Sequence, residues 1–245
     1  MRGLRAAATF LTRVPAGGDV HWPDDLARSL PWFAVVGGLV GAAVGGVRWG
    51  LGLFLPAGAA AALAVGVGLA VTGALHEDGL ADTFDGMGAG RDRDRALQIM
   101  ADSRLGTFGA AALVIGLVTK VALLASLEGR EALAACVSAG GLGRMAAVAW
   151  MTRPARAYGL GAELQSHVTR GSVTGAMVVG VAVGLAAGRA GAVATPIAVA
   201  TSGLIAWWAM RRLGGITGDV LGAIVVVSEV TVLAVVVALV GWISW

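Results

Sequence analysis

Long apolar stretches recur along this chain, and each is long enough to cross a lipid bilayer. Of its 245 residues, 57% are hydrophobic and only 13% are charged, whereas soluble domains carry about 25% charged residues. The chain also contains 39 glycines, and small residues let helices pack closely in lipid. These features predict an all-α fold, a polytopic integral membrane helical bundle that forms a single transmembrane domain over residues 1–245.

Apolar runs bounded by charged residues predict about seven transmembrane helices, since each span needs about 20 residues. The predicted spans cover residues 31–47, 51–75, 107–127, 132–152, 173–188, 192–210 and 220–242. Arg48 and Trp49 leave open whether the first two runs are joined by a tight turn or form one interrupted, tilted pair. The apolar run at 6–11 is too short for a signal peptide, so we expect a short amphipathic surface helix there.

Lys and Arg are distributed unequally between the two ends of the predicted spans. With the N-terminus in the cytoplasm, thirteen arginines fall on the cytoplasmic side and only Arg48, Arg130 and Arg189 on the other. Cytoplasmic loops of membrane proteins carry an excess of Lys and Arg, so the pattern favours an N-in, C-out orientation. The arginines are spread along the membrane flanks without a basic, aromatic patch, and no nucleic-acid partner is expected.

One segment, residues 76–106, holds seven of the fifteen acidic residues. In so apolar a chain, carboxylates at this density need a cation or water around them, so we interpret this as the active-site segment. Asp78, Asp82 and Asp85 are spaced i, i+4, i+7 and would share one face if the second span continued as a helix. Such hard oxygen ligands suit Mg²⁺, which proteins often hold through one or two carboxylates plus substrate phosphates.

The alternative for this segment is a solvated acidic surface without chemistry. It fits Asp92 and Asp94, which alternate with arginines and neutralise them. It fits the three-aspartate face poorly, because no cation stands at helical spacing among those carboxylates. The glycines of the segment are expected to let the chain turn and to bring backbone N–H groups to phosphate oxygens. They are Gly79, Gly86, Gly88 and Gly90.

In the favoured orientation, polar features from four parts of the chain lie on the cytoplasmic face. They are the acidic segment, Thr12-Arg13, the 153–171 loop and the turn at Gly214–Asp219. This convergence predicts a single site. Ionisable residues inside spans are functional or paired with one another: Arg144 is expected to face the bundle interior and Lys120 to reach an interface or a partner. For Glu229, a salt bridge to either cation and a catalytic role both stay open.

Two long motifs and three short ones resemble the cobalamin synthase family, the adenosylcobinamide-GDP ribazoletransferases. The long motifs read TGALHEDGLADTFDG (Thr72–Gly86) and IMADSRLGTFG (Ile99–Gly109); the short ones lie at Phe10–Pro15, Pro31–Gly41 and Gly214–Ala223. They occur in the family's order and cover the chain end to end. The chain departs from the pattern at Ala16-Gly17, where a second proline is usual, and at Val226, where a glutamate is frequent.

The resemblance implies the last assembly step of the nucleotide loop of coenzyme B12. Adenosylcobinamide-GDP reacts with α-ribazole or its 5′-phosphate, a phosphodiester forms to the ribose hydroxyl, and GMP leaves, with Mg²⁺ required. It further implies a bacterial cytoplasmic (inner) membrane location, contact with membrane lipid, and association with other nucleotide-loop enzymes. A homo-oligomer and the choice between α-ribazole and its phosphate stay open.

Joined to this chemistry, the acidic segment yields a site hypothesis. Asp78, Asp82 and Asp85 hold Mg²⁺ against the GDP diphosphate, and His76 or one of the aspartates takes the proton of the attacking hydroxyl. The expected substrate-binding residues are Arg13, Asp102, Ser103, Arg104 and Asp219. Asp219 is expected to complete the metal site or to position the ribazole.

Two other readings compete with this one. A CDP-alcohol phosphotransferase does similar chemistry, but Asp82-Thr83 stand where its motif needs Ala-Arg after Asp78-Gly79. A polytopic transporter could use the carboxylates for ion coupling. Transporters place such groups near the bilayer midplane, often between repeated halves, whereas this chain gathers its carboxylates on one face and has no repeat.

Overall fold

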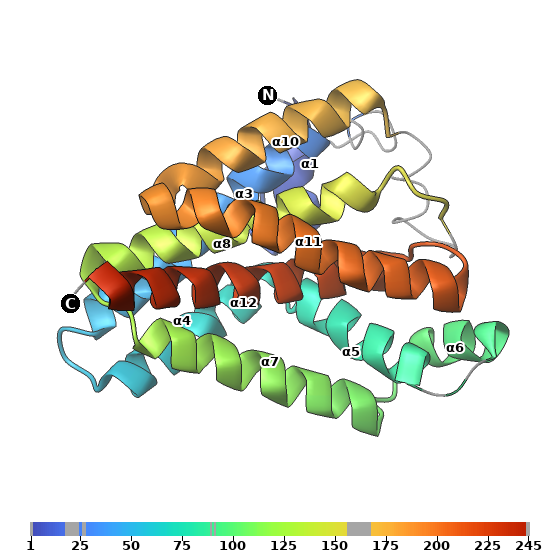
Figure 1. Ribbon diagram of the computed structural model, residues 1–245, viewed down its shortest axis with the longest axis horizontal. Coiled ribbons are helices and arrows are strands. Elements are labelled where there is room, and N and C mark those ends of the chain that lie inside the picture. Colours follow the sequence, from blue (N-terminus) through green and yellow to red (C-terminus); the bar gives the residue numbers. More distant parts are fainter. Residues whose placement is uncertain are drawn as a thin grey trace.

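The computed structural model describes residues 2–17, 25, 28–88, 90, 92–155 and 168–243. Within them the regular structure is helical, with a single isolated bridge between Ala155 and Ile216, so the all-α prediction is confirmed (Figure 1). The helices are α1 (Arg2–Leu11), α3 (Leu30–Leu51), α4 (Ala57–Thr72), α5 (Leu75–Gly88), α6 (Arg93–Met100), α7 (Thr107–Ala125), α8 (Gly129–Trp150), α10 (Arg170–Gly184), α11 (Gly188–Leu213) and α12 (Gly218–Ile243).

Among the described residues, five stretches are long and apolar enough to cross a membrane. They are Leu30–Leu51, Thr107–Ala125, Gly129–Trp150, Arg170–Leu213 and Gly218–Val240. A sixth is reached if α4 and α5, which are bent by 90°, are counted together. The polytopic membrane fold is therefore confirmed, whereas the count of about seven is not. The N-in, C-out orientation stays a prediction.

The difference in count arises partly between residues 170 and 213. Two spans were predicted there, and the chain does form two helices, α10 and α11, joined by a 3₁₀ turn, η1 (Leu185–Ala187). Gly188 after the turn has a φ of +59°. However, α10 has only 15 residues, or about 22 Å at 1.5 Å per residue, which is short of a hydrocarbon core of about 30 Å.

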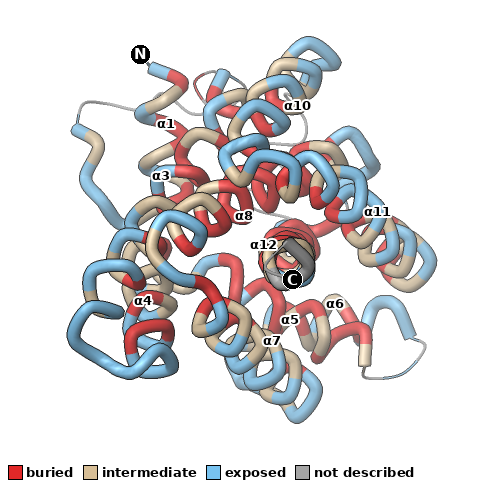
Figure 2. Tube along the Cα trace, turned by 60° about the vertical axis from the view of Figure 1, so that its left-hand side comes forward, coloured by how far each residue is buried: buried red, intermediate tan, exposed pale blue. Residues whose placement is uncertain are grey.

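α8 and α12 form the centre of the bundle (Figure 2). α3 packs along α8 at a distance that only glycine permits. A Cβ on Gly37 would lie 2.2 Å from the carbonyl oxygen of Gly140, and a Cβ on Gly140 would lie 2.1 Å from that of Gly37. This is the close backbone approach that small residues allow in membrane bundles. It explains part of the high glycine content.

The second predicted span, 51–75, is wrong at both ends. α4 starts only after Pro56 and ends at Thr72, where Gly73 (φ +64°) and Ala74 (φ +56°) adopt left-handed backbone conformations. The chain then turns by 90° into α5. α5 is about 21 Å long at 1.5 Å per residue and carries four carboxylates, so it does not cross the membrane alone.

The expected amphipathic N-terminal helix is present as α1. Its buried face consists of Gly3, Ala6, Ala7 and Leu11, and it packs on α3, where the rings of Phe10 and Phe33 stack with centroids 5.6 Å apart. This packing carries the end of α1 to the region where α5 and α12 begin.

Candidate active site

α5 and α12 cross in backbone contact, and this crossing brings distant carboxylates together. A Cβ on Gly79 would lie 2.8 Å from the carbonyl oxygen of Asp219, and a Cβ on Gly222 would lie 3.2 Å from the Cα of Gly79. Asp219 stands in the first turn of α12, whose start is capped by the Thr217 hydroxyl accepting the Val220 N–H. The chain therefore places Asp219 beside the acidic face of α5, as the site hypothesis expected.

The glycines of α5 have a different role from the one predicted. Gly79, Gly86 and Gly88 lie inside the helix, where they admit neighbours. A Cβ on Gly86 would lie 2.3 Å from the Met100 side chain, and one on Gly88 would lie 2.6 Å from the Phe108 ring. They serve close packing of α5, and a helical N–H is already committed to its own helix.

Three carboxylates, those of Asp78, Asp82 and Asp219, lie near enough to influence one another's charge where α5 meets α12. Asp78 is exposed, while Asp82 and Asp219 are half-buried. Burial, followed by the charges of Asp78, Asp219 and Asp85, raises the pKa of Asp82 to about 7. A carboxyl crowded in this way is relieved either by a proton or by a cation. Because α5 is helical, the predicted sharing of one face by its aspartates holds even though α5 does not continue α4.

Asp85, predicted to bind metal, makes hydrogen bonds to the backbone in this structure. One of its oxygens accepts the Gly106 N–H at 2.7 Å and the other accepts the Gly109 N–H at 2.8 Å. A Cβ on either glycine would lie within 2.4 Å of this carboxylate, which explains the glycine spacing of the second long motif. Asp85 thus caps the start of α7, where a helix N-terminus favours negative charge.

The described residues contain no group of three or more His, Cys, Asp or Glu side chains that could hold a metal ion by themselves. The three predicted aspartate ligands do not form such a group by themselves, and their binding of Mg²⁺ stays a prediction. A smaller set remains compatible with Mg²⁺, because this ion usually keeps several waters and binds one or two carboxylates plus substrate phosphates.

Asp102, Ser103 and Arg104 lie on the surface between α6 and α7. The Asp102 carboxylate accepts the backbone N–H of Arg104 at 3.1 Å and forms an ion pair with its guanidinium, with NH2 2.5 Å from Oδ2. Hydrogen bonds from Arg104 hold the pKa of Asp102 at about 2. Substrate binding by this exposed turn stays a prediction.

Arg13 lies at the bend that starts α5. Its backbone N–H donates to the Val71 carbonyl at 2.7 Å, and a Cβ on Gly73 would fall 2.2 Å from the Arg13 Nε. Gly73 is therefore required both for its left-handed φ and for the space taken by this guanidinium. The side chain remains exposed next to the acidic helix, so its expected role toward phosphate stays a prediction.

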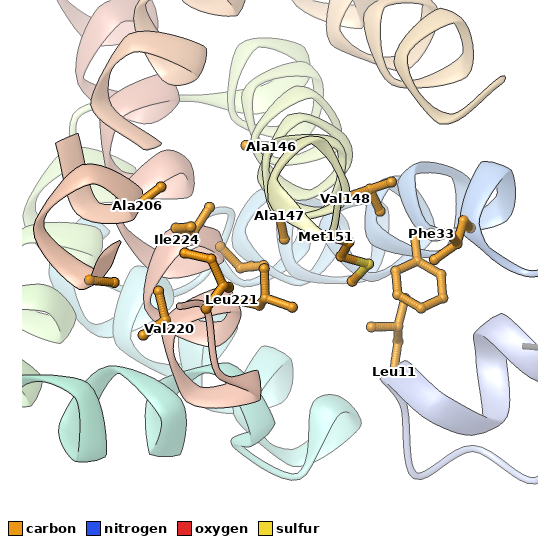
Figure 3. Close-up of a cluster of buried hydrophobic side chains, with 14 of the residues drawn as sticks. Leu11, Phe33, Ala146, Ala147, Val148, Met151, Ala206, Val220, Leu221 and Ile224 are labelled. Carbon is orange, nitrogen blue, oxygen red and sulfur yellow. The ribbon is translucent and has the colours of Figure 1, made fainter. Parts of the chain in front are cut away.

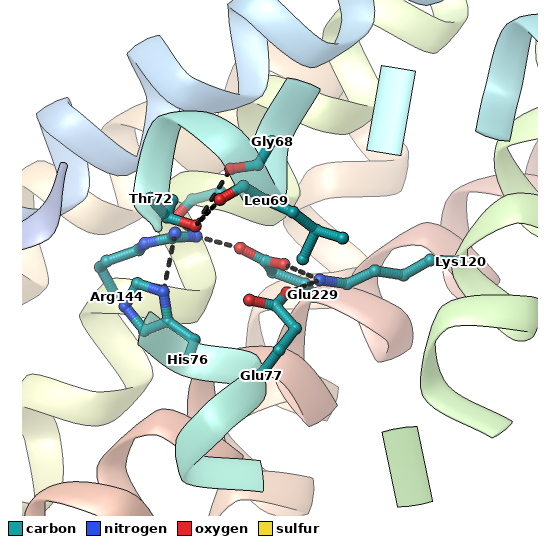
Figure 4. Close-up of polar contacts among 9 residues, drawn as sticks. Gly68, Leu69, Thr72, His76, Glu77, Lys120, Arg144 and Glu229 are labelled. Carbon is teal, nitrogen blue, oxygen red and sulfur yellow. Dashed lines mark hydrogen bonds and ion pairs between the residues drawn. The ribbon is translucent and has the colours of Figure 1, made fainter. Parts of the chain in front are cut away.

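A buried charge network joins four helices beneath the carboxylates (Figure 4). The Lys120 Nζ on α7 lies 3.0 Å from Glu77 on α5 and 2.6 Å from Glu229 on α12. Arg144 on α8 donates to the other oxygen of Glu229. Both salt bridges considered for Glu229 are thus present, and Arg144 faces the bundle interior as predicted. The two cations balance the two carboxylates, as burial of charge requires.

The network also fixes the chemistry of His76. Sequence reasoning placed this residue near the membrane surface as a base, but its side chain is buried. Arg144 NH2 lies 3.4 Å from His76 Nδ1. A guanidinium can only donate, so Nδ1 accepts and the proton of the neutral ring resides on Nε2. His76 is then a hydrogen-bond donor, which leaves the aspartates as proton acceptors.

A cavity of about 420 Å³ opens beside His76. It is lined by Thr9, Phe10, Leu11, Phe33, Leu75, His76, Arg144, Ala147, Met151, Gly218, Asp219, Leu221, Gly222 and Val225. These residues come from α1, α3, α5, α8 and α12, with Met151 directly after the end of α8. Sequence reasoning did not predict this cavity, because its apolar walls look like ordinary core positions; only the Phe10-Leu11 pair before Thr12-Arg13 could have indicated it.

A family model described as cobalamin-5-phosphate synthase matches residues 3–237. The chain belongs to this family. Three of its relatives named adenosylcobinamide-GDP ribazoletransferase are compared with it below. The protein of Roseiflexus sp. (strain RS-1) is 38% identical over 93% of this chain and 86% of its own length. That of Bradyrhizobium diazoefficiens is 38% identical (95% and 92%), and that of Novosphingobium aromaticivorans is 40% identical (91% of each). No solved structure matches the chain.

The two long motifs now have physical explanations. Thr72–Gly86 contains the left-handed bend, the two buried network residues of α5 and the aspartate face. Ile99–Gly109 contains the exposed Asp102–Arg104 turn and the two glycines that bind Asp85. The first motif thus shapes the site, and the second ties α7 to it.

Proposed function

We propose that this chain joins adenosylcobinamide-GDP to α-ribazole, or to its 5′-phosphate, and releases GMP. Membership of the cobalamin-5-phosphate synthase family and the names of the relatives support this activity. The observation that carries it in this chain is the contact of Gly79 with Asp219, which gathers three carboxylates from two helices. Three carboxylates repel a negatively charged diphosphate, so they can bind this substrate only if a cation accompanies it.

The donor set fits Mg²⁺. Asp78 and Asp219 are the residues that would hold the ion, since Asp85 is committed to α7 and each carboxylate supplies a hard oxygen. When bound, Mg²⁺ neutralises charge on the diphosphate and on the departing GMP.

Asp82 is the proposed proton acceptor. It lies between the exposed and buried ends of the aspartate face, and a pKa raised to about 7 by burial is near the value at which a general base works best. The ribose hydroxyl loses its proton to Asp82 as its oxygen attacks the phosphorus attached to the cobinamide. That phosphorus–oxygen bond forms while the bond to the GMP phosphate breaks. Positioning and electrostatics supply most of the acceleration.

We place the site on the cytoplasmic side of the inner membrane. The thirteen arginines on the side of α5 and α6 support this orientation through the positive-inside rule. Adenosylcobinamide-GDP and GMP are both water-soluble and charged, so an acidic helix too short to cross the bilayer suits their entry and release.

The test is GMP release by purified protein in detergent. Adenosylcobinamide-GDP is supplied with or without α-ribazole 5′-phosphate, and with Mg²⁺ or EDTA. We expect release only when both substrates and the metal are present. Folded protein that releases no GMP under these conditions would overturn the proposal.

A further inference from the structure

We propose that the 420 Å³ cavity binds the aromatic base of the ribazole, with the His76 Nε2–H donating to the ring nitrogen that bears no sugar. This inference rests on the proposed function and assigns one of its substrates to a place. The volume lies within the range of about 300–1,000 Å³ found for small-molecule pockets.

The walls of the cavity suit a flat, apolar ring system. Phe10 and Leu11 enter from α1, Phe33 from α3, Met151 from the end of α8 and Leu221 from α12; four of these side chains and their neighbours are shown in Figure 3. The rings of Phe10 and Phe33 are inclined by only 19° and offer an aromatic surface. Aromatic rings favour offset stacking on such surfaces.

One polar group of the cavity, His76, matches the single accepting nitrogen of the base. A benzimidazole joined to a sugar through one nitrogen keeps one accepting nitrogen and has no donor. The cavity offers His76 as a donor, whose ring is oriented by Arg144, and the charge of Arg144 is already met by Glu229. A purine would bring further polar groups against Leu11, Phe33 and other apolar walls, where unpaired buried groups are unfavourable.

The cavity is continuous with the reacting centre. Asp219 lines it and also lies beside the aspartate face of α5, while Gly222 lines it at the α5–α12 crossing. A base seated against Phe10 and Phe33 therefore leaves its sugar directed to the carboxylates. The arrangement accounts for the participation of α1, which otherwise has no part in the chemistry.

The first test pairs a substrate analogue with a variant. In the analogue, the accepting ring nitrogen is replaced by CH, giving an indole-type riboside of the same shape. With the unmodified enzyme, we expect the KM of the analogue to exceed that of α-ribazole roughly 10- to 100-fold, the effect of one lost buried hydrogen bond. In His76→Phe the two compounds should have equal KM, while the KM for adenosylcobinamide-GDP stays unchanged. Discrimination that persists in His76→Phe would overturn the role of His76.

A second variant tests the occupancy of the cavity independently of whether His76→Phe folds. Ala147→Leu fills the cavity from α8, and Ala149→Leu, two residues along and outside the cavity, is its matched control. Equilibrium dialysis of labelled α-ribazole against both proteins in detergent should show loss of binding in Ala147→Leu alone. Equal binding by the two would show that ribazole does not occupy the cavity and would overturn the proposal. An unmodified enzyme that releases no GMP would instead refute the proposed function, so the two failures are distinguishable.

Discussion

The buried charge network makes a quantitative prediction about stability. Lys120→Met removes the cation that contacts both Glu77 at 3.0 Å and Glu229 at 2.6 Å. Two carboxylates then share the single charge of Arg144 inside the bundle. The side chains of Lys120, Glu77 and Glu229 are only 10%, 11% and 15% exposed, so water screens them little. Breaking a buried pair by removing one partner costs about 3–5 kcal/mol, and we expect a loss of that size in the free energy of unfolding.

The size of the effect follows from the contacts. Charges 4 Å apart interact by about 4 kcal/mol at an effective dielectric constant of about 20, and Lys120 has two such partners, partly offset by its own desolvation. Glu77→Gln combined with Lys120→Met removes one charge of each sign and leaves the Arg144–Glu229 pair intact. The double variant should therefore lose less than the sum of the two single variants, with a coupling of about 1–3 kcal/mol.

The assay is unfolding by SDS in mixed micelles, followed through the fluorescence of the eight tryptophans. Arg130→Met, which removes an exposed cation at the start of α8, is the matched control and should change stability by no more than about 0.5 kcal/mol. If Lys120→Met loses less than about 1 kcal/mol, the range of solvent-exposed pairs, the network is hydrated and the reasoning is refuted.

Three further predictions concern the active site. Asp82→Asn should abolish GMP release while Mg²⁺ affinity and membrane insertion persist; retained turnover would remove Asp82 from the role of base. In the unmodified enzyme, kcat/KM should fall as the pH drops through about 7, because burial raises the pKa of Asp82 and only its ionised form accepts a proton; a profile flat to pH 5 would contradict this. Asp85→Ala should cost about 1–3 kcal/mol of stability by leaving the buried Gly109 N–H and the half-buried Gly106 N–H unpaired, yet leave Mg²⁺ affinity unchanged, as isothermal titration would measure.

Sequence reasoning identified the class of fold and the helix face shared by the aspartates because both depend on local patterns. Apolar runs mark helices in lipid, and a spacing of i, i+4, i+7 places Asp78, Asp82 and Asp85 on one helix face in any context. The pairing of Glu229 also follows from a general rule, since a charge within a span needs a partner.

The features that were missed depend on tertiary contacts. The bend before α5 includes Ala74 at φ +56°. This conformation cannot be predicted from the sequence, because non-glycine residues rarely adopt it. The role of Asp85 depends on N–H groups more than twenty residues away. His76 became a donor only through Arg144, 68 residues further along the chain.

At the crossing of α5 and α12, no side chain lies between the two backbones. The backbone spacing of Asp219 from the aspartates of α5 is therefore set by contact of main-chain atoms. Movement of a single side chain therefore does not change the distance between α5 and α12. That distance changes only when a whole helix moves. Substrates of different size are accordingly accommodated elsewhere, in the cavity walls, while the spacing of the two helices stays constant.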